Sequence, residues 1–190
     1  MIEQWMHDKL KKDIGEARYK HSIRVMNTSI ELAKRYNYPV EEAALAGFLH
    51  DCGKLKGKIN LLKIADDFDI ILDNVMRNNV ELIHGPLGEQ IAIKEYHVTN
   101  KNVLNAIRYH TTGREDMTLL EKIVYVADIV EPGRRFEGVD KIRQLTDKNI
   151  NLGLLYALDR TIIFVVQRGK LVHLDTIKAR NQLLILKGLE

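Results

Sequence analysis

The chain has 190 residues, 45% of them hydrophobic, so it is long enough to bury a core and too apolar to be disordered. Lys and Arg number 29 against 26 for Asp and Glu, and the net charge of +3 is too small to indicate a surface that coats nucleic acid. The single cysteine, Cys52, excludes an internal disulfide and a multi-cysteine zinc site. The N-terminus lacks a basic segment followed by an apolar one, and no apolar run approaches a membrane span. We therefore expect a cytoplasmic protein that has no membrane partner and forms no stable nucleic-acid complex.

The hydrophobic periodicity is helical, and strand-like alternation is hard to find between the turn signals. We predict an all-α fold with one domain over residues 1–190, comprising a metal-site core at about 16–135 and C-terminal helices at about 139–187. The expected helices cover residues 2–11, 16–36, a run ending at 51, 61–65, 70–76, 87–96, 102–109, 117–130, 141–146, 152–170 and 176–186. The residues expected on the inner faces of the two longest helices are Ile23, Met26, Ile30, Ala33, Leu155, Leu158, Ile162 and Val166.

His21 lies on the helix predicted at 16–36, near the edge of its apolar stripe, where a lone histidine is commonly solvated. The next predicted helix delivers His50 and Asp51 into the core at its C-terminal end, and we expect Gly53 to end it in a left-handed conformation. Burying a carboxylate beside an imidazole is costly unless a partner such as a divalent cation satisfies both groups. A lone His-Asp pair would more often be solvated, so its meaning depends on the rest of the chain.

Further polar groups interrupt apolar helices downstream. His84 is expected just outside the N-terminus of a helix that has Pro86 in its first turn. His110 follows the helix at 102–109, whose inner residues are Val103, Ala106 and Ile107. Asp128 is the only charged side chain in residues 123–130, where an unpaired carboxylate would be destabilising, so a metal ligand is the favoured role. Nitrogen and carboxylate ligands without cysteine suit iron, manganese, nickel or zinc.

The series His21, His50, Asp51 and Asp128 resembles the ligand set of the HD-domain metal-dependent phosphohydrolases, an all-α superfamily with a helical-bundle fold. Longer runs resemble the YqeK-type subgroup: His21-Ser22, residues 50–54 (HDCGK), His84-Gly85, residues 110–114 (HTTGR), residues 125–134 (YVADIVEPGR) and residues 179–181 (ARN). The resemblance implies symmetrical hydrolysis of diadenosine tetraphosphate to two ADP, with one or two divalent ions and iron as the expected metal. The chain departs from the subgroup at Glu89, where a small residue is expected, and at Leu174, where proline is expected.

In this interpretation His21, His50, Asp51 and Asp128 hold the first ion, and metal-bound hydroxide attacks an inner phosphate. His84 and His110 bind a second ion or a phosphate. We assign catalytic roles to Asp51, Lys54 and Arg134. The residues expected to bind the dinucleoside polyphosphate or its nucleoside diphosphate products are Arg18, Lys54, His84, His110, Thr111 and Arg134.

Two alternatives remain open: an HD hydrolase of another nucleotide phosphoanhydride or phosphoester, and a non-catalytic nucleotide- or RNA-binding module. The superfamily motif alone does not separate the substrates, whereas a degenerate binding module would be expected to have lost at least one ligand. Adenine and guanine nucleotides are not distinguished. We leave three histidines outside the site, expecting His7 and His97 at the surface and His173 at the C-terminal turn.

Overall fold

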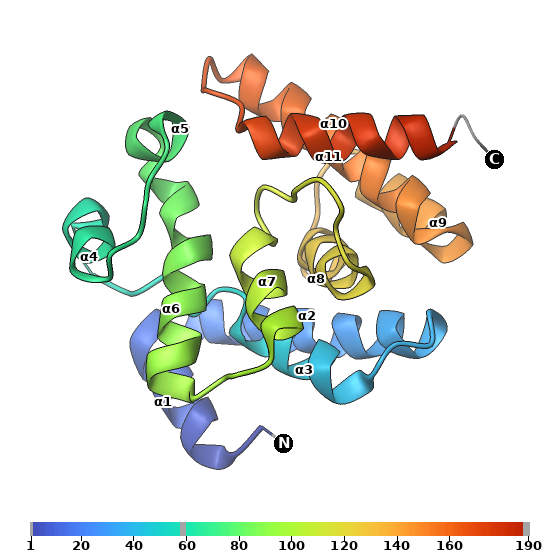
Figure 1. Cartoon of the computed structure of the whole chain (residues 1–190). Coiled ribbons are helices and arrows are strands. Elements are labelled where there is room, and N and C mark those ends of the chain that lie inside the picture. Colours follow the sequence, from blue (N-terminus) through green and yellow to red (C-terminus); the bar gives the residue numbers. More distant parts are fainter. Residues whose placement is uncertain (1, 58–59, 188–190) are drawn as a thin grey trace.

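The computed structural model of the protein describes residues 2–57 and 60–187, and this part of the chain contains helices and no strand, which confirms the all-α prediction. The helices are α1 (Gln4–Ile14), α2 (Glu16–Arg35), α3 (Val40–Leu49), α4 (Leu61–Asp67), α5 (Asn74–Asn78), the 3₁₀ helix η1 (Val80–Ile83), α6 (His84–Tyr96), α7 (Lys101–Tyr109), α8 (Leu119–Val130), α9 (Val139–Lys148), α10 (Ile150–Gln167) and α11 (Leu174–Lys187). Figure 1 shows α10 and α11 side by side at one end of the molecule and α1, α2 and α3 at the other.

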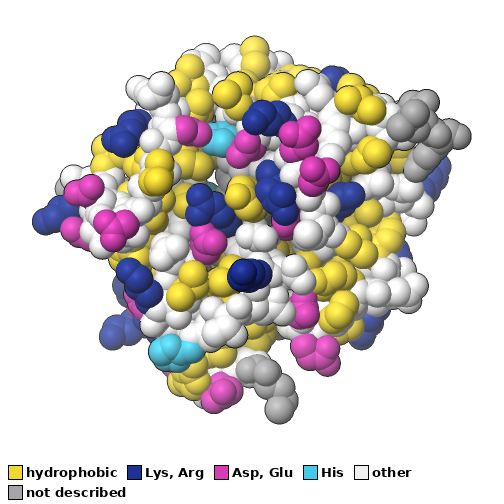
Figure 2. Space-filling model, in the orientation of Figure 1, with side chains coloured by type: hydrophobic (Ala, Val, Ile, Leu, Met, Phe, Trp, Pro, Cys, Tyr) yellow, Lys and Arg dark blue, Asp and Glu magenta, His cyan; other side chains and the backbone are white. Residues whose placement is uncertain are grey.

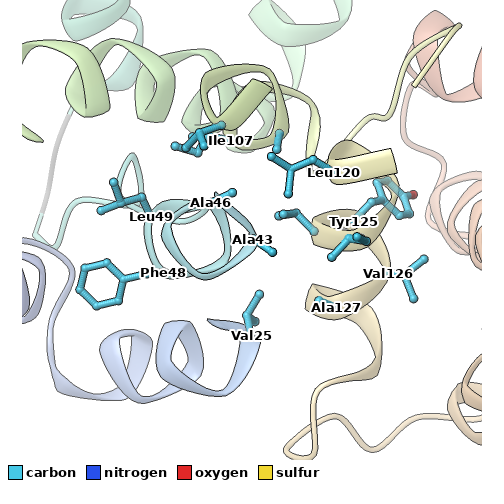
Figure 3. Packing of buried hydrophobic residues seen from close by; sticks show 14 of the residues in the cluster. Val25, Ala43, Ala46, Phe48, Leu49, Ile107, Leu120, Tyr125, Val126 and Ala127 are labelled. Atoms are coloured by element: carbon cyan, nitrogen blue, oxygen red, sulfur yellow. The ribbon is translucent and has the colours of Figure 1, made fainter. Parts of the chain in front are cut away.

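Helix α3 lies at the centre of the core, in contact with α2, α7 and α8. In Figure 3 it is seen nearly end on, with Phe48 and Leu49 on one side and Ala43 facing α8. Phe48, Leu49, Ala43 and Ala46 are all fully buried. Packing on all sides fixes the C-terminal end of α3, where the His-Asp pair follows.

Capping side chains explain where several helices begin. Asn100, Thr118 and Asn149 each accept a hydrogen bond from a backbone N–H of the first turn of α7, α8 and α10. The main helices lie within a few residues of their predicted positions. The prediction was poorest at 70–76, where α5 covers only Asn74–Asn78, and η1 was not expected.

The inner face predicted for α2 was only partly right, although Ile23 and Met26 do pack against the core. Ala33 is buried, but Ile23, Met26 and Ile30 are only half-buried, and the buried face carries His21, Ser22, Val25, Thr28, Ser29, Leu32 and Ala33. A Cβ added at Gly47 of α3 would lie 2.6 Å from Ser29 Oγ and 3.0 Å from the Cα of residue 26. The two helices approach so closely that small residues occupy the contact, and the larger apolar side chains flank it.

The exposed end of α10 differs from the prediction in a similar way. Leu155 and Leu158 are buried as expected, Ile162 is half-buried, and Val166 is 60% exposed. Helix α10 also corrects the expectation that no apolar run approaches a membrane span. Its 18 residues have a mean hydropathy of 1.4, so the helix is long and apolar enough to cross a membrane by length and composition alone. Of these residues, 33% are buried within the protein. Helices buried in the cores of water-soluble proteins pass the same test.

Candidate metal centre

The His-Asp pair lies at the turn where α3 ends against the start of α6. Helix α3 ends at Leu49, and His50 and Asp51 are buried immediately after it. Gly53 is not in a left-handed conformation, so our prediction for it was wrong. Gly53 instead allows the backbone of this turn to approach the backbone of α6, because a Cβ at Gly53 would lie 2.2 Å from the His84 carbonyl oxygen and 2.7 Å from the Gly88 nitrogen.

The same close packing places His84 beside His110. His84 is the first residue of α6 rather than a residue outside it, because η1 leads directly into that helix. A Cβ at Gly85 would lie 2.4 Å from the carbonyl oxygen of Arg108, near the end of α7, so the two helix ends pack backbone to backbone. The Nε2 atoms of His84 and His110 are 3.0 Å apart, and Thr111 Oγ1 is 3.1 Å from each.

The two carboxylate oxygens of Asp51 face two different pairs of histidines. Oδ2 lies 3.4 Å from His50 Nε2 and 3.8 Å from His21 Nε2. Oδ1 lies 3.5 Å from both His84 Nε2 and His110 Nε2. Asp51 is therefore placed where one carboxylate could bridge two ligand groups.

Asp128 completes the group around His21. Its Oδ1 lies 2.9 Å from His21 Nε2 and 3.8 Å from His50 Nε2. His21 is buried on α2 rather than at the edge of an apolar stripe, and the Asp128 side chain is 18% exposed. The first group of candidate ligands thus draws residues from α2, from the turn after α3 and from α8.

The donor set fits a divalent cation. Among the described residues, His21 Nε2, His50 Nε2 and Asp51 Oδ1 are buried and make no hydrogen bond, although charged neighbours such as Asp128 and Lys54 lie close to them. Buried polar atoms without hydrogen bonds are costly, and a cation would satisfy these three together. Three overlapping groups have ligand atoms within 4.8 Å of one another: His21, His50 and Asp51; His50, His110 and Asp128; and Asp51, His84 and His110.

The pKa shifts of Asp51 and His84 favour the forms that bind a metal, whereas the shift of His50 does not. Burial raises the pKa of Asp51, but the neighbouring His50, His110 and Lys54 outweigh it, so the net shift is well below the ordinary value. Burial lowers the pKa of His84, and the positive charges of Lys54 and His110 lower it further. An ionised carboxylate and a neutral imidazole are the forms that bind cations. For His50, burial lowers the pKa, but Asp51 and Asp128 raise it to a net increase.

Three basic side chains surround the carboxylates. Arg18 Nη1 lies 2.9 Å from Asp51 Oδ2, and Lys54 Nζ lies 3.2 Å from Asp51 Oδ1. Arg134 donates from Nε to the Asp128 carbonyl oxygen and from Nη2 to the Asp128 carboxylate. Their side chains are 38%, 34% and 36% exposed, so these cations lie between the buried carboxylates and solvent.

A cavity of about 480 Å³ opens on the Asp51 side of the cluster. Arg18, Lys54, His84 and Thr111 are among the residues that line it, together with Gly53, Leu55, Gly57, Leu61, Asn79, Glu81 and Leu82. Arg134 is not among them and lies beside Asp128 instead. Four of the predicted substrate-binding residues therefore share one cavity. On the face in Figure 2, acidic and basic side chains are interspersed, and no broad basic surface is visible there.

Glu131 belongs to this site although we assigned it no role from the sequence. Its carboxylate accepts hydrogen bonds from His21 Nδ1 and from Arg24. Burial raises the pKa of Glu131, but the bonds from Arg24, the Gly133 N–H and His21 outweigh this and lower it to about 2. The signal available in the sequence was its position three residues after Asp128, within the run that resembles the family.

The three histidines left outside the site lie apart from the cluster. His97 is exposed, as expected. His7 is half-buried, contrary to expectation, because α1 packs its ring against Phe48 and the Tyr19 hydroxyl. His173 orders the C-terminal turn as expected, since its Nδ1 accepts the backbone N–H of Asp175.

Comparison with known proteins assigns the family. The model of the HD domain matches residues 18–133. The chain is 38% identical to the symmetrical bis(5'-nucleosyl)-tetraphosphatase of Bacillus subtilis, over 92% of this chain and 93% of that one. The protein of the same description from Staphylococcus aureus is 37% identical over 90% and 89% of the two chains. A crystal structure from Clostridium acetobutylicum, described as that of a predicted HD superfamily hydrolase involved in NAD metabolism, superposes with a TM-score of 0.89 at 44% identity, and the match covers 94% of each chain. The chain therefore belongs to the HD-domain family and, within it, to the YqeK-type subgroup.

Proposed function

We propose that this protein hydrolyses diadenosine tetraphosphate symmetrically to two ADP and depends on a divalent metal. The relatives from Bacillus subtilis and Staphylococcus aureus are described as symmetrical bis(5'-nucleosyl)-tetraphosphatases and match over about nine tenths of both chains. The observation that carries the proposal is the placement of Asp51, whose two oxygens face the His21–His50 pair and the His84–His110 pair.

In this proposal His21, His50, Asp51 and Asp128 hold one ion, and Asp51, His84 and His110 form a second position for an ion or a phosphate. When bound, a divalent cation supplies Lewis acidity that activates water and neutralises phosphate charge. Iron is the metal we propose, and the same nitrogen and carboxylate donors also suit manganese, nickel or zinc. The buried, sulfur-free ligand set supports a divalent metal without selecting one of these.

The basic residues orient the phosphate chain and stabilise the charge of the leaving group. Arg18 and Lys54 line the cavity beside Asp51 and keep donors toward solvent, where phosphate oxygens can reach them. Thr111 Oγ1 lies beside both His84 and His110, so its hydroxyl can hydrogen-bond a phosphate held there. Arg134 acts from the other side: it holds the Asp128 carboxylate and its exposed edge can contact the departing ADP.

A substrate panel tests this proposal against its alternatives. The purified protein, loaded separately with Fe²⁺, Mn²⁺, Ni²⁺ or Zn²⁺, is assayed with diadenosine and diguanosine tetraphosphates, nucleoside triphosphates and a single-stranded RNA. We expect turnover of the dinucleoside tetraphosphates and loss of that turnover in Asp51→Asn, which keeps the side-chain volume.

Preferred turnover of a nucleoside triphosphate would favour another HD hydrolase activity. Tight RNA binding without hydrolysis of any substrate would favour the binding module. Equal turnover by Asp51→Asn and the unmodified protein would show that the cluster is not the site of the reaction.

A further inference from the structure

Three of the four clustered histidines are oriented by carbonyls of their own helix ends. The Nδ1–H groups of His50 and His110 donate to the carbonyls of Gly47 and Ile107, each at 2.7 Å, and that of His84 donates to the carbonyl of Glu81. Every acceptor lies three residues earlier, in the last turn of a helix. The last carbonyls of a helix lack intrahelical partners and can accept such bonds.

His21 cannot use this device. It is the sixth residue of α2, which continues to Arg35, so the preceding carbonyls accept backbone N–H groups of the helix itself. Its Nδ1 instead lies 3.1 Å from Oε1 of Glu131, a residue 110 positions away in the chain. The carboxylate after α8 thus takes the place that a free carbonyl holds at the other histidines.

Glu131 is itself held on the opposite side. Its side chain is only 2% exposed, and Oε2 accepts Nε of Arg24 at 2.6 Å together with the backbone N–H of Gly133. A Cβ at Gly133 would lie 2.7 Å from Arg24 Nε and 2.9 Å from Glu131 Oε2, so a larger residue there would displace the Arg24–Glu131 pair. The carboxylate is fixed before it contacts His21, as a rigid orienting group requires.

We propose that Glu131 is a positioning residue for the metal site. By accepting the Nδ1 proton of His21, it selects the tautomer whose Nε2 lone pair faces Asp128 and Asp51. It also prevents rotation of the ring on α2. This inference rests on the metal site proposed above and adds to it a residue that does not contact the ion. Partners of this kind commonly contribute 10- to 100-fold to metal affinity.

The chain offers a matched control for loss of a buried carboxylate. Glu121 is fully buried on α8 and accepts two hydrogen bonds from Arg114, at 2.9 and 2.8 Å. Among the described residues, Glu121 has no side-chain hydrogen bond to a histidine of the cluster. Its removal breaks the same kind of Arg–Glu pair without touching a proposed ligand.

The experiment titrates Co²⁺ into metal-free protein by calorimetry, and the visible spectrum of the bound Co²⁺ reports its coordination. Glu131→Ala should weaken affinity by about 10- to 100-fold and alter the spectrum. Glu131→Gln should lose less, because its amide oxygen can still accept the His21 proton. Glu121→Ala should lower the melting temperature while its Co²⁺ affinity stays within about threefold of the unmodified protein, since metal affinity responds to the partners of the ligands.

Unchanged affinity and spectrum in Glu131→Ala would overturn the inference, as would equal losses in Glu131→Ala and Glu121→Ala. If Glu131→Ala does not fold, Glu131→Leu decides, because leucine fills most of the same volume but cannot accept the His21 proton. Co²⁺ affinity and spectrum of that variant identical to those of the unmodified protein would overturn the inference. If the unmodified protein binds no Co²⁺, the proposed metal site fails and this inference fails with it. Strong Co²⁺ binding without hydrolysis would contradict only the proposed activity.

Discussion

At the residue scale, Asp51 connects the two halves of the cluster. A carboxylate offers two acceptor oxygens, and here each oxygen faces its own pair of imidazoles. Burial raises the pKa of Asp51, but the neighbouring histidines and Lys54 lower it by more, so the carboxylate stays ionised. Asp128 has a similar role on one side only, beside His21 and His50.

This asymmetry predicts different outcomes for two histidine substitutions. His21→Ala should remove the first ion, because His21 contacts both Asp128 and Asp51. His110→Ala should leave the first ion bound and weaken only the position beside His84. Elemental analysis of the purified variants, together with kcat and KM, measures the difference.

Both variants replace a buried imidazole by alanine, so each serves as a control for the other in folding. If His110→Ala empties the site as completely as His21→Ala, one ion with a larger ligand set would replace the two positions.

The sequence was informative about residues that carry charge within apolar runs. The sequence predicted that His50, Asp51 and Asp128 are carried into the core by apolar helices, and the structure brings the three side chains into one cluster. The position of Glu131 within the family-like run marked it as a candidate, but its contacts could not be predicted, because His21 and Arg24 are more than 100 residues away in the chain.

At the scale of elements, the site is made where helix ends meet. The turn after α3, the start of α6 and the end of α7 approach at backbone distance, and Gly53 and Gly85 occupy the two contacts. The side chains of His50, Asp51 and His84 are therefore positioned by close backbone packing.

Gly53→Ala tests this packing. A methyl group at Gly53 would lie 2.2 Å from the His84 carbonyl oxygen, so α6 must move and carry His84 with it. We expect a lower melting temperature and at least a tenfold loss of kcat/KM, because small displacements of catalytic groups are costly. Circular dichroism during heating and steady-state kinetics measure the two effects.

Gly169→Ala is the matched control. Gly169 has a φ of +62° and no atom within 4 Å of an added Cβ, so the change costs about 1 kcal/mol of backbone strain without a steric clash. Its kcat/KM should equal that of the unmodified protein. A Gly53→Ala enzyme with full activity would show that the contact does not position His84.

Helix positions were easier to predict than helix faces. Apolar periodicity and capping residues indicate where α7 and α8 lie, and Val103, Ala106 and Ile107 are buried as expected. Periodicity does not say which neighbour covers a helix or how closely. Periodicity therefore could not predict that Ser29 and Gly47 lie at the α2–α3 contact, or that Val166 is exposed at the end of α10.

At the scale of the whole molecule, the cluster ties together segments that are distant in sequence. His21 comes from α2, His50 and Asp51 follow α3, His84 begins α6, His110 follows α7 and Asp128 lies on α8. The family model matches residues 18–133, which contain all of these residues, and helices α9 to α11 lie after it. A cation at this position would stabilise the native arrangement of the entire core.

Metal removal should therefore lower thermal stability. A ligand that binds only the folded state at 100 times its dissociation constant adds about 2.7 kcal/mol. We expect chelation to lower the melting temperature of the unmodified protein and to have little effect on His21→Ala. Differential scanning calorimetry of both proteins, with and without chelator, measures this. A melting temperature of the unmodified protein that does not respond to chelation would contradict a metal held by the core.

The position of bond cleavage tests the central claim most directly. If the cluster and the cations Arg18, Lys54 and Arg134 fix one register of the phosphate chain, water attacks an inner phosphorus and the opposite ADP leaves. Diadenosine tetraphosphate hydrolysed in ¹⁸O-labelled water should then give ADP as the only nucleotide product. Mass spectrometry should place one label on the β-phosphate of half of the ADP molecules. Formation of AMP and ATP in place of ADP would contradict symmetrical hydrolysis.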